Sequence, residues 1–164
     1  IARHPNLIVI RTFSKWAGLA GLRVGYCLCH EKLAGHFLTI KQPYNVNVAG
    51  EAAAIASLHD VDYLKINVEK LRSERDRLSA ALSAIPWLQV SPSQANFVLC
   101  RVLETGYRGR TITAKAVRDG LRRRGILVRF YETPELRDCL RISVGLPEDT
   151  DALLLGLKEV WDEV

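Results

Sequence analysis

The chain has 164 residues, of which 48% are hydrophobic and 25% are charged, which is the balance of a soluble globular protein with a proper core. No apolar run reaches the ~18 residues that a membrane-spanning helix needs, so no membrane association is expected. The net charge of +5 comes largely from Arg122–Arg124 and Lys65–Arg77. These clusters could bind nucleic acid or could simply be solvated helix surfaces. Acidic residues are interspersed in the second cluster, so we expect helix surfaces and no nucleic-acid partner.

The first elements in chain order are two short apolar runs, Leu7–Ile10 and Val24–Cys29. Near-continuous apolarity is typical of strands in a covered parallel or mixed sheet, and that is what we expect here. Three helices should follow, over residues 31–41, 48–58 and 60–84. Pro43 separates the first two, because it disfavours helical geometry at the residue before it, and Pro86 stops the third.

After Pro86 the pattern changes to short strands, predicted at 87–90, 96–102, 126–129 and 140–144. A helix over residues 113–124 is closed by Gly125 as its C′ residue, and a final amphipathic helix occupies 148–161. This order predicts an α+β domain, in which an antiparallel-rich sheet has its helices on one face.

Between the two first apolar runs lies the stretch R-T-F-S-K-W-A-G-L-A-G-L-R-V-G-Y, from Arg11 to Tyr26. A lysine at a strand end, here Lys15, can form a Schiff base with a carbonyl cofactor. The hydroxyls of Thr12 and Ser14 and the guanidinium of Arg23 can hold a phosphate. On residue chemistry alone, a solvated loop with glycines at its turns is an equally good interpretation.

This segment resembles the cofactor-lysine signature of the fold-type I aminotransferases that use pyridoxal 5'-phosphate, and it is most similar to the histidinol-phosphate aminotransferase branch. The resemblance implies that Lys15 bonds the cofactor covalently and that Ser14 and Arg23 bind its phosphate, with Thr12 beside them. It implies no metal.

The resemblance covers almost the whole chain and implies the C-terminal portion of such an α/β enzyme. Residues 1–58 would be the tail of the large cofactor-binding domain and its sheet, 59–85 a long connecting helix, and 86–164 a small α+β C-terminal domain. The family's N-terminal part, which supplies the groups around the cofactor ring, has no counterpart in this sequence. The first residue is Ile and the sequence contains no Met, which also indicates a chain cut from something longer.

Two arginines, Arg129 and Arg141, lie in or at the end of apolar strands, where an unpaired charge is expensive. Either a bound anion or an internal ion pair must compensate them, and the acids available nearby are Glu132, Glu135 and Asp138. The resemblance implies that Arg141 holds the carboxylate of the amino donor and that both arginines meet the substrate phosphate. Asn96 resembles a residue near the active-site entrance, although a backbone-capping role at the start of a strand explains it equally well.

The resemblance implies amino transfer between glutamate and imidazole acetol phosphate, which yields 2-oxoglutarate and histidinol phosphate, by a cytoplasmic homodimer. Tyr44, Asn45 and Asn47 would border the dimer interface, or serve as ordinary turn residues. Two alternatives stay open. One is another class I or II aminotransferase or a decarboxylase of a phosphate-bearing substrate, and the other is a non-catalytic C-terminal or dimerisation domain.

The remaining polar groups indicate no further chemistry. The four cysteines lack C-x-x-C spacing, so buried free thiols in a reducing compartment are expected: Cys27, Cys29, Cys100 and Cys139. Three histidines in or beside predicted helices should have surface or capping roles: His30, His36 and His59. The residues before the first strand lack the long apolar core of a secretory signal, consistent with a cytoplasmic location.

Overall fold

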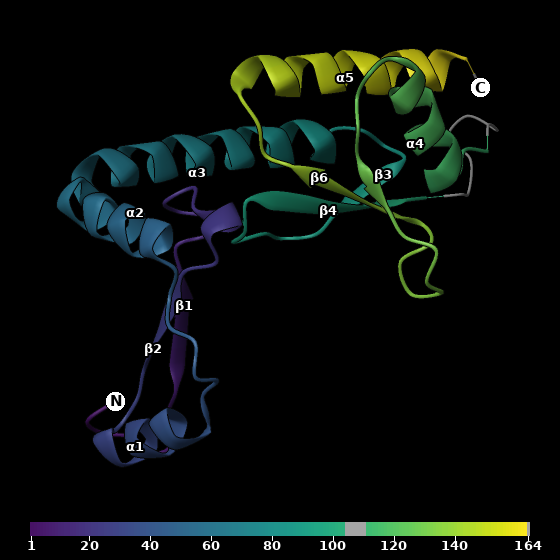
Figure 1. Cartoon of the computed structure of the whole chain (residues 1–164). Coiled ribbons are helices and arrows are strands. Elements are labelled where there is room, and N and C mark those ends of the chain that lie inside the picture. The colour runs from purple at the N-terminus through teal and green to yellow at the C-terminus, as the bar shows by residue number, and fades with distance from the viewer. Residues whose placement is uncertain (104–110, 164) are drawn as a thin grey trace. The chain divides into compact units, whose positions relative to one another are not determined.

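A computed structural model describes residues 1–103 and 111–163 (Figure 1). The chain divides into two compact units, Ile1–Val68 and Glu69–Val164. The border between them falls inside the long helix α3 (Val61–Ser83), which matches the helix predicted over 60–84. No helix among the described residues is both long and apolar enough to cross a membrane.

The first unit contains a two-stranded antiparallel sheet of β1 (Val9–Thr12) and β2 (Gly25–Leu28), in which Thr12 stands opposite Gly25. Between the strands lie a turn and a short 3-10 helix, η1 (Ala20–Leu22). The strands themselves were predicted, but the expected covering was not found within this unit. Every residue of β2 is exposed, and Ile10 of β1 is 79% exposed.

Two helices complete the first unit, α1 (Glu31–Ile40) and α2 (Val48–His59), and both confirm the sequence prediction to within one residue. His30 caps α1, because its Nδ1 accepts a hydrogen bond from the Lys32 amide at 3.3 Å. The histidine therefore has the capping role expected of it. The buried core of this unit is small and consists of Phe13, Val24 and Ala54.

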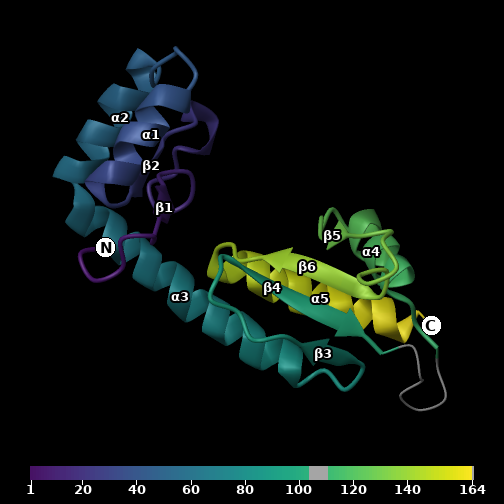
Figure 2. The same ribbon diagram turned by 90° about the horizontal axis from the view of Figure 1, so that it is seen from below.

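The second unit is built on a four-stranded antiparallel sheet with the order β3-β4-β6-β5. Its strands are β3 (Leu88–Val90), β4 (Phe97–Val102), β5 (Arg129–Phe130) and β6 (Cys139–Ser143). The helices are the C-terminal part of α3, α4 (Ala114–Arg123) and α5 (Pro147–Asp162). In Figure 2 the sheet is seen from the side away from α5.

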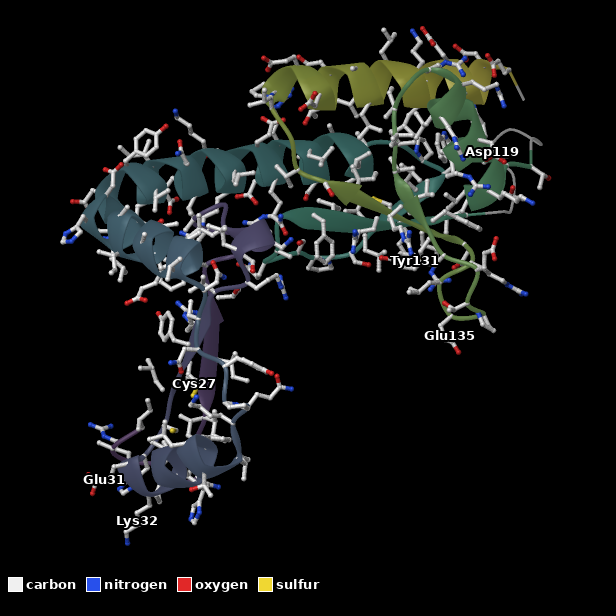
Figure 3. All side chains as sticks on the ribbon, viewed as in Figure 1. Cys27, Glu31, Lys32, Asp119, Tyr131 and Glu135 are labelled. Atoms are coloured by element: carbon white, nitrogen blue, oxygen red, sulfur yellow. The ribbon has the colours of Figure 1, made fainter. Side chains whose placement is uncertain are left out.

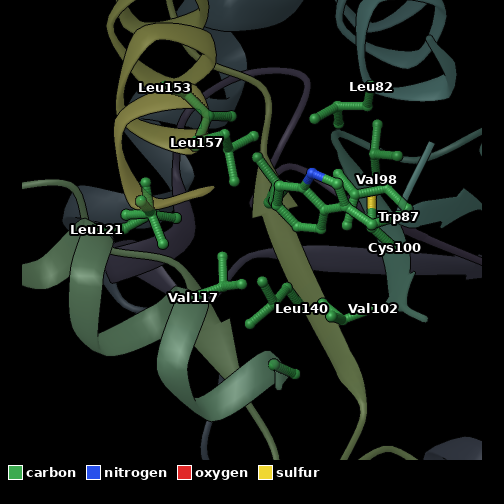
Figure 4. Packing of buried hydrophobic residues seen from close by; sticks show 14 of the residues in the cluster. Leu82, Trp87, Val98, Cys100, Val102, Val117, Leu121, Leu140, Leu153 and Leu157 are labelled. Atoms are coloured by element: carbon green, nitrogen blue, oxygen red, sulfur yellow. The ribbon is translucent and has the colours of Figure 1, made fainter. Parts of the chain in front are cut away.

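The core of the second unit lies between one face of this sheet and the three helices (Figure 4). Alternate residues of β4 and β6 supply the sheet side of the core: Val98, Cys100, Val102, Leu140 and Ile142. Leu82, Leu121 and Leu157 come from the helices and are fully buried. The rings of Trp87 and Trp161 stack with their centroids 5.4 Å apart. The predicted α+β arrangement, with an antiparallel sheet and helices on one face, is confirmed.

Helix α4 ends in a glycine cap, as predicted. Gly125 has φ +77, its amide donates to the Arg122 carbonyl, and the Ile126 amide donates to the Leu121 carbonyl, both at 3.0 Å. The strand expected over 126–129 begins only at Arg129, and the cap bond of the Ile126 amide accounts for the loss of residue 126.

Many of the clustered basic residues are paired with carboxylates. In α3, Arg72 pairs with Glu69 at 2.6 Å and Arg77 pairs with Glu74 at 2.9 Å. At the end of α4, Arg124 pairs with Glu159 of α5 at 2.7 Å. These pairs favour the interpretation of both clusters as helix surfaces.

The cysteines correct one expectation. All four are free, and Cys100 and Cys139 are buried as predicted, but Cys27 on β2 is exposed and Cys29 is half-buried. Figure 3 labels Cys27 on its strand. The prediction of a buried thiol at Cys27 is wrong, because apolar flanks do not bury a strand whose faces carry no neighbouring layer. Burial raises the pKa of the Cys100 thiol to about 12, so that thiol is unreactive at neutral pH.

Candidate active site

Three of the predicted cofactor-binding residues meet at one hollow beside the first sheet. Thr12, Ser14 and Arg23 line this hollow, which has a volume of about 460 Å³. The hydroxyl oxygens of Thr12 and Ser14 lie 2.8 Å apart, and the Ser14 amide donates to Thr12 Oγ1 at 3.0 Å. The end of β1 and the start of β2 thus bring two hydroxyls and a guanidinium to the same place, although eleven positions separate Thr12 from Arg23 in the sequence.

Arg23 has an unusual backbone. Its φ of 57 and ψ of 45 make it the single non-glycine residue with positive φ in the described chain. The left-handed conformation is costly for a residue with a side chain. Nη1 of the Arg23 guanidinium donates a hydrogen bond to the Ala20 carbonyl at 3.1 Å. An arginine has five N–H donors, so the group retains donors for an anion.

Lys15 lies in the turn directly after Ser14 and is exposed. Its carbonyl accepts a hydrogen bond from the Gly18 amide at 3.1 Å, which holds the turn. The hollow lined by Arg23 does not include Lys15 in its lining. The structure therefore brings Thr12, Ser14 and Arg23 together and places Lys15 next to them, outside the lining of the hollow.

Asn47 supports this site and has a clearer role than the sequence showed. Its Oδ1 accepts the Gly50 amide at 2.8 Å and so caps α2, while its Nδ2 donates to the Leu22 carbonyl at 2.9 Å. A Cβ on Gly50 would lie 2.7 Å from a Val24 methyl and 3.1 Å from the Leu22 carbonyl, so helix α2 packs closely against both neighbours of Arg23. An Asn directly before an alanine-rich helix is a capping signal that could have identified the cap, whereas Asn47 was predicted only as a turn or dimer-border residue.

We expect Asn47→Ala to lower the local stability at the start of α2 by about 1 kcal/mol, because a capping hydrogen bond is lost. Hydrogen exchange of the Gly50 amide measures this change. Asn45→Ala is the control, since the Asn45 side chain accepts a hydrogen bond from the exposed Lys41 amine, at 3.2 Å, and caps no helix among the described residues. Equal exchange rates in the two variants would contradict the role given to Asn47.

In the second unit, Arg129 of β5 and Arg141 of β6 stand directly opposite each other. The neighbours of Arg141 along β6, Leu140 and Ile142, are buried in the core. Because successive strand residues point to opposite faces, both arginines lie on the face that the helices leave open. The Arg141 guanidinium lies over the Phe97 ring at 5.3 Å, and the Arg129 guanidinium over Tyr131 at 5.5 Å. Figure 3 labels Tyr131 just after β5.

The ion pair considered for Arg129 is not formed. Asp138 pairs instead with Arg101 of β4. Among the carboxylates that the structure describes, none lies within ion-pair distance of Arg129 or Arg141. The Nε of Arg141 is buried and has no hydrogen-bond partner in the described chain. Both charges are thus available to an external anion.

Asn96 directly precedes β4 and is exposed. Its carbonyl accepts the Val144 amide at 3.0 Å, which extends the ladder between β4 and β6 by one bond. This bond is made by the main chain, so both a backbone-capping role and a substrate contact of the Asn96 side chain stay predictions. The described residues contain no group of three or more side chains suited to a metal ion.

Comparison with known proteins gives a consistent result. The family model for aminotransferase class I and II matches residues 1–156. A protein of Roseiflexus castenholzii named histidinol-phosphate aminotransferase is 54% identical over 98% of this chain. The chain spans 42% of the length of that relative.

Solved structures show the same likeness. The histidinol-phosphate aminotransferase of Clostridium acetobutylicum matches with a TM-score of 0.85 and 26% identity, over 99% of this chain and 48% of that one. The enzyme of that name from Sinorhizobium meliloti, solved in complex with pyridoxal-5'-phosphate, matches with a TM-score of 0.79 and 36% identity, over 97% of this chain and 42% of that one.

Proposed function

Because the chain belongs to the class I and II aminotransferase family, we propose that it is the C-terminal part of a pyridoxal phosphate-dependent histidinol-phosphate aminotransferase. The reaction transfers an amino group between glutamate and imidazole acetol phosphate, with 2-oxoglutarate and histidinol phosphate as the products. The observation that carries this proposal is the 54% identity to a protein of that name over 98% of the chain.

The hollow at the end of β1 fits the phosphate of the cofactor. Phosphate oxygens accept hydrogen bonds, and the hollow offers the hydroxyls of Thr12 and Ser14 and the guanidinium of Arg23. Lys15, one residue beyond Ser14, is the primary amine that can bond an aldehyde. When bound, pyridoxal phosphate supplies an electron sink for charge on the substrate carbon.

The residues of this chain would then have separate tasks. Thr12, Ser14 and Arg23 bind and orient the cofactor phosphate. The Lys15 amine moves a proton to or from the substrate α-carbon. Arg141 and Arg129 hold the carboxylate of glutamate or the phosphate of the other substrate, which a planar guanidinium can bind in a bidentate manner. Asn96 borders the entrance to the site.

The proposal includes the organisation of the whole enzyme. Residues 1–58 are the end of the large domain, 59–85 the connecting helix and 86–164 the small domain. The border between the two compact units, at residues 68 and 69, lies within the proposed connecting helix and supports this division. Exposed apolar residues in the first unit, with Tyr44 83% and Val48 84% exposed, support a homodimer. We propose a cytoplasmic location.

The test joins this chain to the part of the Roseiflexus relative that it does not cover. We expect the hybrid to form 2-oxoglutarate from glutamate and imidazole acetol phosphate, with pyridoxal phosphate present. The matched control carries Arg141→Ala, which should raise the KM for the phosphate substrate by about tenfold or more, because a charged hydrogen bond contributes about 1.5–3 kcal/mol.

Release of CO₂ from a phosphate-bearing amino acid, without amino transfer, would instead identify a decarboxylase. A folded, cofactor-loaded hybrid with neither activity would show that the chain does not supply the catalytic half of such an enzyme.

A further inference from the structure

The register of β5 on β6 places two positive charges side by side. Arg129 and Arg141 are directly opposed in an antiparallel ladder, where facing Cα atoms are ~4.5–5.5 Å apart. Like charges in this position repel each other. A short strand such as β5, with two residues, has little else to offset that repulsion. Water can solvate the exposed Arg129, whereas the half-buried Arg141 needs a further contact that stabilises its charge.

Carboxylates do not provide this stabilisation. Asp138 is engaged by Arg101, and Glu132 and Glu135 are exposed. The buried Nε of Arg141 lacks a hydrogen-bond partner in the described chain, although an unsatisfied buried donor is costly. The Arg141 guanidinium is thus held in place by a contact that leaves its Nε–H unused.

The guanidinium groups of Arg129 and Arg141 each lie close to an aromatic ring. Arg141 lies 5.3 Å from the centroid of Phe97, and Arg129 lies 5.5 Å from that of Tyr131. Both distances are within the ~6 Å at which a ring face attracts a cation. A ring attracts the cation as a whole, and the N–H groups in the plane of a guanidinium can still donate to an anion.

Arg118 of α4 shows the contrasting arrangement in the same unit. Its guanidinium also lies over a ring, that of Phe130, at 5.0 Å. Asp119 Oδ1, however, lies 2.6 Å from Arg118 Nε, so a carboxylate compensates this charge even though the buried Nε makes no hydrogen bond in the described chain. Arg118 and Asp119 together carry no net charge. Arg129 and Arg141 contact rings without an adjacent carboxylate, so their positive charges are not neutralised by the described chain.

We propose that Phe97 and Tyr131 are positioning residues, which orient Arg141 and Arg129 by their ring faces and keep both fork edges open for one phosphate group. The inference rests on the proposed anion-binding role of the two arginines and adds the means by which they are held. Its ligand class is the phosphate monoester dianion, for which inorganic phosphate serves as the probe.

The test titrates inorganic phosphate into the 164-residue chain with ¹⁵N-labelled arginine side chains, followed by NMR. The Nε–H signal of Arg141 should shift on binding. We expect Phe97→Leu and Tyr131→Leu each to weaken phosphate binding about threefold to tenfold, and Phe97→Leu to speed exchange of the Arg141 Nε–H with water. Phe97→Tyr and Tyr131→Phe, which keep the ring, should retain phosphate affinity within about twofold.

Arg129→Ala and Arg141→Ala separate the two proposals. If both arginine variants lose phosphate binding while both leucine variants bind like the original chain, the rings do not position the site, and the anion site stands. If the arginine variants also bind phosphate normally, or the original chain does not bind it, the anion site fails and the inference with it. Should Phe97→Leu not fold, Tyr131→Leu and Tyr131→Phe decide the outcome.

Discussion

Lys15→Ala is expected to abolish the covalent attachment of pyridoxal phosphate to this chain. The aldehyde of the cofactor bonds a primary amine reversibly, and borohydride reduction makes that bond permanent. The phosphate of the cofactor would dock on Thr12, Ser14 and Arg23, and Lys15 is the amine that the chain places next to Ser14. Mass spectrometry of the reduced protein should find the cofactor on the peptide that contains Lys15, and on no peptide of the variant.

Lys32 provides the matched control, because it is an exposed lysine of the same unit in the first turn of α1. Lys32→Ala should leave the labelling of Lys15 unchanged. Labelling spread evenly over the exposed lysines, with no excess at Lys15, would show that the hollow does not direct the cofactor. Arg23→Ala should reduce the labelling of Lys15 at low cofactor concentration, since the phosphate loses its guanidinium partner.

Leu121→Ala is expected to lower the free energy of unfolding of the second unit by about 2–5 kcal/mol, the range for truncating a buried leucine. Leu121 is fully buried, and Figure 4 shows it facing Leu153 and Leu157 of α5. Its carbonyl also accepts the Ile126 amide in the cap of α4. The loss should appear in urea unfolding followed by the fluorescence of Trp87 and Trp161.

The control for this experiment is Leu127→Ala, the same chemical change six residues later. Leu127 is 80% exposed, so its truncation should change stability by less than about 0.5 kcal/mol. A similar loss in both variants would mean that the packing described for α4 does not determine the stability of this unit.

The helices of both units were largely predictable from the sequence, because their signals are local. Asn47 before α2 and Gly125 after α4 are capping residues whose chemistry depends on a few neighbouring amides. The start of β5 was misplaced, because the Ile126 amide bonds the Leu121 carbonyl in the cap of α4 and is not free for strand pairing.

Strand surroundings could not be predicted in this way. The apolar character of β1 and β2 indicated strands correctly, but it does not reveal which layers lie against them, and Ile10 and Cys27 are exposed. Registers are equally non-local: nothing in the sequence around Arg129 or Arg141 shows that the two stand opposite each other. The roles of Phe97 and Tyr131 depend on that register, and for this reason the sequence did not indicate them.

The left-handed backbone at Arg23 has a consequence for any attempt to make this protein more robust. Glycine adopts that conformation without a Cβ penalty, and the strain avoided is about 1–2 kcal/mol. Selection for heat resistance alone would therefore reward replacing Arg23 by glycine and would discard its positive charge. At position 23, therefore, thermal stability favours glycine, whereas binding of an anion favours arginine.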